Sequence, residues 1–113
     1  MTDTELLHGT LELLILKTLT VGPLHGYAIA RGIRESSGEV LLVKEGSLYP
    51  ALYRMERRGW LRAHSGTSEN GRRARFYRLT SVAIRRLETE EAQWNRYADA
   101  VARVLATAGK GVI

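Results

Sequence analysis

The sequence of 113 residues predicts a mainly α-helical protein with a small β-hairpin. Apolar residues recur at helical spacing in three short segments that precede residue 60. Residues 60–79 instead alternate around a glycine-containing loop, and the helical spacing returns after residue 80. Since hydrophobic residues make up 44% and charged residues 26%, as in ordinary globular chains, we expect one domain with an appended helix.

The first predicted helix spans residues 10–19, because apolar side chains recur there every three or four residues. Gly22 and Pro23, both strong helix breakers, follow it. The second helix spans residues 25–36 and is followed by Gly38, which suits a C-terminal cap. These two helices are therefore short and separated by a tight connection.

The third predicted helix is preceded by an apolar, β-branched connection, residues 39–46, which we expect to form one small strand. Gly46 or Ser47 then caps the helix. Pro50 falls in its first turn, where a missing amide hydrogen costs little, and Gly59 ends it.

The hairpin consists of residues 60–65 and 73–79, joined by the loop GTSENG, which holds Gly66, Asn70 and Gly71. In the second strand, Ala74 and Phe76 share one face. One long helix of 27 residues, 80–106, follows and would span about 40 Å.

The positive charge is concentrated in one stretch of the chain. Residues 54–78 hold eight arginines and two acidic residues, a net charge of +6, whereas the remaining residues sum to −1. A local field of this kind suits a polyanion such as nucleic acid. The alternative is a solvated basic face without a specific partner.

Several classes of protein are disfavoured by the composition. The chain has no cysteine, so disulfides, thiol nucleophiles and cysteine-ligated zinc are excluded. His8, His25 and His64 lack the spacing of metal ligands, and no phosphate-binding glycine loop or nucleophile elbow is present. We therefore expect neither an enzyme nor a cofactor. The apolar run at residues 13–16 is too short for a signal peptide or a membrane span, which favours a cytoplasmic protein without a membrane partner.

The order of three helices and a hairpin is that of a winged helix-turn-helix, in which the last helix enters the major groove of DNA. On a helical projection, the apolar stripe of the third helix comprises Leu48, Ala51, Leu52 and Met55. The opposite side carries Tyr49, Tyr53, Arg54 and Arg57. Arginine can contact guanine or phosphate, and tyrosine can donate its hydroxyl to phosphate. For the two tyrosines, packing at the edge of the core is the alternative.

Three segments, LHGYAIARGI, EGSLYPALYRMERRGWL and GRRARFYRLT, closely resemble the PadR family of bacterial transcriptional regulators. The resemblance covers Leu11 to Leu105, and the short chain is similar to the compact subfamily with a single C-terminal dimerisation helix. It implies a homodimer that binds a pseudo-palindromic operator on double-stranded DNA, usually as a repressor, and that an effector can release. The DNA contacts that it implies are His25, Tyr27, Ser47, Tyr49, Tyr53, Arg72, Arg73 and Arg75, with Gly26 as a further contact or support, and the helical projection adds Arg54 and Arg57. For Gly26, close helix packing is the alternative.

The long helix carries a seam with an average period of 3.5 residues, which we expect to pack on the first helix and on a second copy of the chain. Its members are Ile84, Leu87, Glu91, Trp94, Ala98, Val101 and Leu105. In drug-responsive relatives an aromatic residue at the dimer interface stacks on flat hydrophobic ligands, so Trp94 is a candidate effector site; ordinary packing in the seam is the alternative. The expected division is a DNA-binding domain, residues 1–79, and a dimerisation helix with a short tail, residues 80–113.

Two other functions share some of these features. A non-specific nucleic-acid-binding (architectural) protein would carry the same basic patch, but it would not need a recognition helix or a dimer of fixed spacing. A protein-interaction module would reserve the long helix for a different partner.

Overall fold

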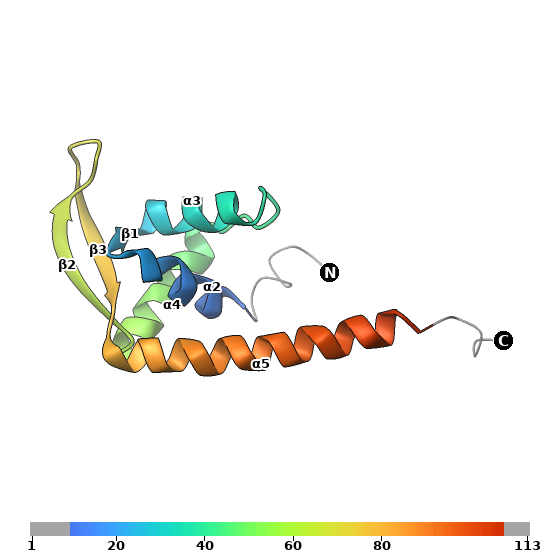
Figure 1. Ribbon diagram of the computed structural model, residues 1–113. Helices are drawn as coiled ribbons and strands as arrows, with labels where there is room; N and C mark the ends of the chain where they lie inside the picture. Colours follow the sequence, from blue (N-terminus) through green and yellow to red (C-terminus); the bar gives the residue numbers. More distant parts are fainter. Residues whose placement is uncertain (1–9, 108–113) are drawn as a thin grey trace.

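The computed structural model describes residues 10–107 and confirms a mainly helical chain with a small sheet (Figure 1). The hairpin stands at one end of the helical body, and the last helix extends past the other end (Figure 1). In chain order the elements are α2 (Leu11–Thr18), the 3-10 turn η1 (Leu19–Val21), β1 (Leu24–His25), α3 (Gly26–Ser36), α4 (Glu45–Arg57), β2 (Leu61–Thr67), β3 (Arg73–Leu79) and α5 (Ser81–Leu105).

One apolar core lies between the helices and the inner face of the sheet. The predicted stripe of α4 is confirmed, since its four apolar side chains are all buried. Burial of these groups is the main favourable contribution to folding. The largest fully buried side chains are Ile15, Leu16, Ile29, Leu48, Leu52, Met55 and Leu61.

The sheet has three antiparallel strands in the order β1-β3-β2. The predicted hairpin is confirmed, with Tyr77 buried and paired to Ala63. The strand predicted at residues 39–46 is wrong, because residues 40–44 have no strand partner and the third strand is instead β1. Leu24 and His25 pair with the free edge of β3, which places the start of α3 beside the hairpin.

Both helices of the helix-turn-helix end in the same glycine-dependent turn. After α4, the N–H of Gly59 donates to Glu56 O over 3.0 Å and the N–H of Trp60 donates to Met55 O over 3.0 Å. Gly59 adopts φ +79°, as this Schellman motif requires. Gly38 ends α3 in the same way, with φ +66°. The two predicted helix ends are thus confirmed.

The predicted start of α4 is wrong by two or three residues. Helix α4 begins at Glu45, and Lys44 occupies the N-cap position instead of Gly46 or Ser47. The N–H of Ser47 and the N–H of Leu48 both donate to Lys44 O, at 3.0 and 2.9 Å. Gly46 and Ser47 therefore lie within the first turn of the helix.

Helix α5 begins where the sequence predicts. Thr80 is its N-cap, and Thr80 Oγ1 accepts the N–H of Ala83 over 3.2 Å. Ala83 and Leu87 are buried in the core, whereas the C-terminal turns of α5 extend past the body (Figure 1). Within residues 10–107, no helix has both the length and the apolar character needed to cross a membrane.

Candidate nucleic-acid interface

A cleft of about 780 Å³ lies between the hairpin, the start of α3 and the first half of α4. Helix α3 and strand β1 form one wall, and the hairpin loop with the start of β3 forms the other. Six of the ten predicted DNA contacts line it. They are His25, Tyr27, Tyr49, Arg72, Arg73 and Arg75.

The start of α3 is fixed by His25. Its Nδ1 accepts the N–H of Ala28 over 3.3 Å, so the imidazole satisfies one of the free amides of the first helical turn. The ring also packs edge-on against Phe76 of β3, at 5.3 Å between centroids. These contacts place Tyr27, which is exposed, at the mouth of the cleft.

Gly26 lets α4 approach the start of α3. A Cβ atom on Gly26 would lie 2.5 Å from the hydroxyl oxygen of Tyr49 and 2.8 Å from its Cζ, distances that no side chain can occupy. The alternative weighed for Gly26, close helix packing, is therefore its role in the fold. The contact holds Tyr49 partly packed, with 44% of the side chain exposed.

The exposed side of α4 is formed by a tyrosine and an arginine. Tyr53 is 60% exposed, and Arg57 Nη1 donates to its hydroxyl over 3.4 Å. The guanidinium of Arg57 also lies 5.6 Å from the centroid of the Tyr53 ring. The pair projects away from the core, as the helical projection predicts.

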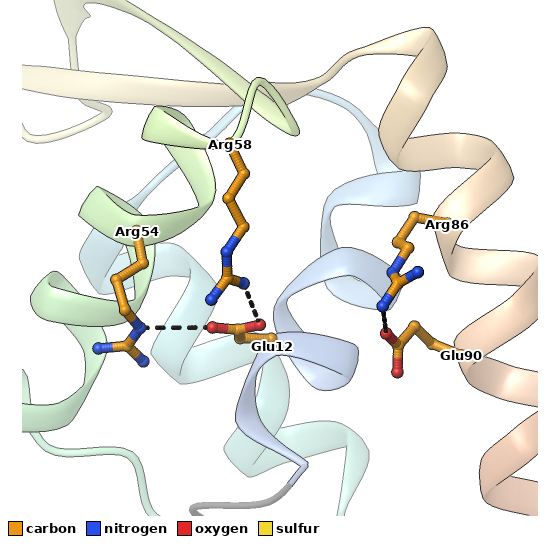
Figure 2. Close-up of polar contacts among 5 residues, drawn as sticks. All are labelled: Glu12, Arg54, Arg58, Arg86 and Glu90. Carbon is orange, nitrogen blue, oxygen red and sulfur yellow. Dashed lines mark hydrogen bonds and ion pairs between the residues drawn. The ribbon is translucent and has the colours of Figure 1, made fainter.

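Tyr53 and Arg57 lie outside the cleft, as do the two other predicted contacts on α4. Arg54 turns toward α2, where its Nε lies 3.5 Å from Glu12 Oε2 (Figure 2). Ser47 is half-buried in the first turn of the helix. DNA contact by either residue stays a prediction.

The arginines of the hairpin differ in their partners. Arg72 and Arg73 are exposed at the hairpin tip and have no ion-pair partner among residues 10–107. Arg75 is paired instead, with Nη2 at 2.7 Å from Glu56 Oε2. Of these three arginines, the two at the tip can therefore meet phosphate without breaking an ion pair within the described chain.

Sequence reasoning missed one arginine of the cleft, Arg31 on α3. Its guanidinium lies 5.7 Å from the Tyr27 ring centroid, and its Nη2 lies 3.4 Å from Glu69 Oε1 in the hairpin loop. The signal that would have found it is spacing, because Arg31 follows Tyr27 by one helical turn. The ion pair joins the α3 wall of the cleft to the hairpin.

One buried phenol of β3 has a shifted pKa. Burial raises the pKa of the Tyr77 phenol, and the nearby Arg75 guanidinium only partly opposes this, so Tyr77 stays neutral near pH 7. Among residues 10–107, no three histidine or acidic side chains lie close enough to hold a metal ion.

The predicted seam of α5 divides into two halves. In the first half, Leu87 is buried against α2, and Glu91 lies 3.3 Å from Nζ of Lys17. The pairing of Glu91 with Lys17 links α5 to α2 of the same chain. Ile84 is 53% exposed and so lies outside the buried part of the seam.

The second half of the seam is uncovered. Trp94 is exposed and borders a cavity of about 600 Å³ between α5 and α2. Tyr97, which the seam did not include, lies 6.0 Å from Trp94 between ring centroids. The exposed apolar side chains of this half are Trp94, Tyr97, Val101, Val104 and Leu105.

Solved structures of regulators share this architecture. A transcriptional regulator from Clostridium thermocellum is 27% identical with a TM-score of 0.78, over 88% of this chain and 96% of that one. A PadR family transcriptional regulator from Eggerthella lenta is 31% identical with a TM-score of 0.76, over 92% of this chain and 88% of that one.

Sequence comparison gives the same result. An uncharacterized 37.1 kDa protein in a transposon of Streptomyces fradiae is 42% identical over 79 residues, which are 70% of this chain and 21% of that protein. The profile of the transcriptional regulator PadR-like family matches residues 15–89. That family comprises regulators of transcription and not enzymes. The chain belongs to the PadR-like family, and it is a DNA-binding transcriptional regulator.

Proposed function

We propose that the chain is a homodimeric repressor that binds a pseudo-palindromic operator and thereby blocks access of polymerase. The observation that carries this proposal is the cleft, where two arginines of the hairpin tip, without an ion pair among residues 10–107, share the lining with one tyrosine of α3 and one of α4. Guanidinium and phenol groups are suited to phosphate and base edges.

In this proposal α4 enters the major groove with Tyr53 and Arg57 foremost. Arg72 and Arg73 contact phosphates or the minor groove beside it. His25 and Tyr27, at the start of α3, support the backbone contact. Arg75 is a secondary contact, because it must leave Glu56 before it can bind a phosphate.

The second copy of the chain is the proposed partner of α5. Its second half exposes apolar and aromatic side chains along one face, continuous with the buried contact of Leu87 on α2. An exposed stripe of this kind is stabilised by burial against an equivalent helix. On this basis we keep residues 1–79 as the DNA-binding part and residues 80–113 as the dimerising part, although the first turns of α5 share the core of the former.

For an effector, we propose a small hydrophobic or aromatic molecule at Trp94. The support is the cavity of about 600 Å³ that Trp94 and Tyr97 border together with Leu13. Titration of planar aromatic compounds should quench or shift the emission of Trp94 in a Trp60→Phe background. A spectrum that no compound changes would leave Trp94 with a packing role alone.

The cytoplasmic location stays a prediction.

Footprinting on the DNA around the chain's own gene tests the proposed function. We expect two protected half-sites related by a two-fold axis and about 10 base pairs, or a multiple, between their centres. Uniform protection of any duplex would instead favour the non-specific architectural protein. A complex with a different protein on α5 would favour the interaction module.

A further inference from the structure

The end of α4 and the start of α5 are joined through Thr80. Its N–H donates to Trp60 O over 3.0 Å, and its hydroxyl donates to Gly59 O over 2.7 Å. The same hydroxyl oxygen accepts the N–H of Ala83 and so caps α5. One side chain thus links the turn after the recognition helix to the first turn of the long helix.

A second joint is made by the Trp60 side chain. Its ring lies 4.8 Å from the guanidinium carbon of Arg58, at the end of α4, and 5.4 Å from that of Arg86 on α5. We call Trp60, Arg58 and Arg86 the Trp60 clasp. An indole ring attracts nearby cations, so Trp60 connects the end of α4 to α5 through the two arginines.

Carboxylates hold both guanidiniums of the clasp in place (Figure 2). Arg58 Nη1 lies 2.8 Å from Glu12 Oε1 on α2, and Arg86 Nη2 lies 2.9 Å from Glu90 Oε1 on α5. Each arginine is therefore oriented twice, by an ion pair and by the indole. The matched neighbour Arg85 is exposed and has no ion pair within the described chain.

Because α5 is long, a small change in the angle between α4 and α5 moves its far end by several ångströms. Its 25 residues span about 37 Å. A tilt of about 5° at the clasp displaces the far end by about 3 Å, close to the rise of one base pair. In a dimer held through α5, a tilt of about 5° at one of the two clasps therefore changes the separation of the recognition helices by about one base pair.

We propose that Trp60 is a positioning residue, which fixes the α4–α5 angle through the clasp and so sets the half-site spacing that the dimer accepts. The inference rests on the proposed dimeric operator binding. Without the clasp, the α4–α5 angle can vary at little cost in free energy. The dimer then binds operators over a wider range of half-site spacings. A purely structural role for Trp60 would lower stability and leave the spacing preference unchanged.

The test measures the affinity of the full chain for the footprinted operator and for versions with one base pair added or removed between the half-sites. The variants are Trp60→Leu, Trp60→Phe and Arg86→Met, with Arg85→Met as the control. We expect the wild type, Trp60→Phe and Arg85→Met to prefer the native spacing by about tenfold. For Trp60→Leu and Arg86→Met we expect a preference for the native spacing of less than about threefold.

Dimer content and thermal midpoint are measured on the same samples. A native spacing preference in a folded, dimeric Arg86→Met variant and in Trp60→Leu would overturn the inference while leaving the proposed function intact. Should Trp60→Leu not fold, Arg86→Met decides alone, since Arg86 is a half-exposed surface residue. A wild type that is monomeric or binds all duplexes equally would overturn the proposed function, and this inference with it.

Discussion

Replacement of Arg73 by alanine removes an exposed cation of the hairpin tip that has no ion-pair partner among residues 10–107. Such a cation releases condensed counterions when it meets a phosphate. Arg75, two residues away, is already neutralised by Glu56 at 2.7 Å. The two arginines should therefore differ in how much they contribute to the salt dependence of operator binding.

The expected size of the effect follows from the two wings of a dimer. Arg73→Ala removes about two phosphate contacts, so the slope of log affinity against log salt becomes shallower by about 1.8. Over a fourfold rise in salt, the wild type then loses about twelvefold more affinity than the variant does. For Arg75→Ala we expect less than about half of this change in slope, because Glu56 already compensates its charge.

The assay is a set of operator titrations at several salt concentrations, with Arg85→Ala as a control that removes one exposed cation from α5. The control should leave the slope unchanged. An unaltered slope in Arg73→Ala would remove Arg73 from the phosphate contacts. Equal changes in Arg73→Ala and Arg85→Ala would mean that overall charge, and not a located contact, causes the salt dependence.

Three further substitutions test other parts of the account. Gly26→Ala should destabilise the fold by about 1–3 kcal/mol in urea denaturation, since its Cβ would overlap Tyr49, and adding Tyr49→Ala should restore part of the loss. No destabilisation would contradict the close packing. Tyr53→Phe should lower operator affinity by about tenfold with an unchanged thermal midpoint; equal affinity would show that its hydroxyl makes no contact. Burial raises the pKa of Tyr77 above 10.0, so its contribution to stability is constant below pH 10 and falls as pH rises further, since the unfolded chain then loses this proton first. Tyr77→Phe should flatten this fall, and a fall of the same steepness in the variant would refute the assignment.

Much of the fold could be predicted from local pattern. The stripe of α4, the hairpin and the start of α5 at Thr80 each depend on residues a few positions apart, and the structure confirms all three. Strand β1 could not be predicted in this way. Two residues carry no periodicity, and Leu24 and His25 become a strand only because β3, about 50 residues later, offers a free edge.

In the candidate site, too, some features could be predicted from local pattern and others depend on distant residues. Helical projection placed Tyr53 and Arg57 on the outer side of α4 correctly, but it grouped them with Arg54, which Glu12 draws toward α2. The apolar residues of the loop before α4 were also misread, since Val40 is 70% exposed there. The orientation of Arg54 depends on Glu12, which is 42 residues away in sequence. The exposure of Val40 depends on how the rest of the described chain packs, which local pattern does not reveal.

The central claim is that two copies of this chain bind one operator through paired recognition helices and hairpins. Sedimentation of the complex with a duplex from upstream of the chain's own gene, in competition with a random duplex at physiological salt, tests it most directly. We predict two chains on each operator and a preference of about a thousandfold over the random sequence. A single chain on each duplex, or equal affinity for both sequences, would contradict the account.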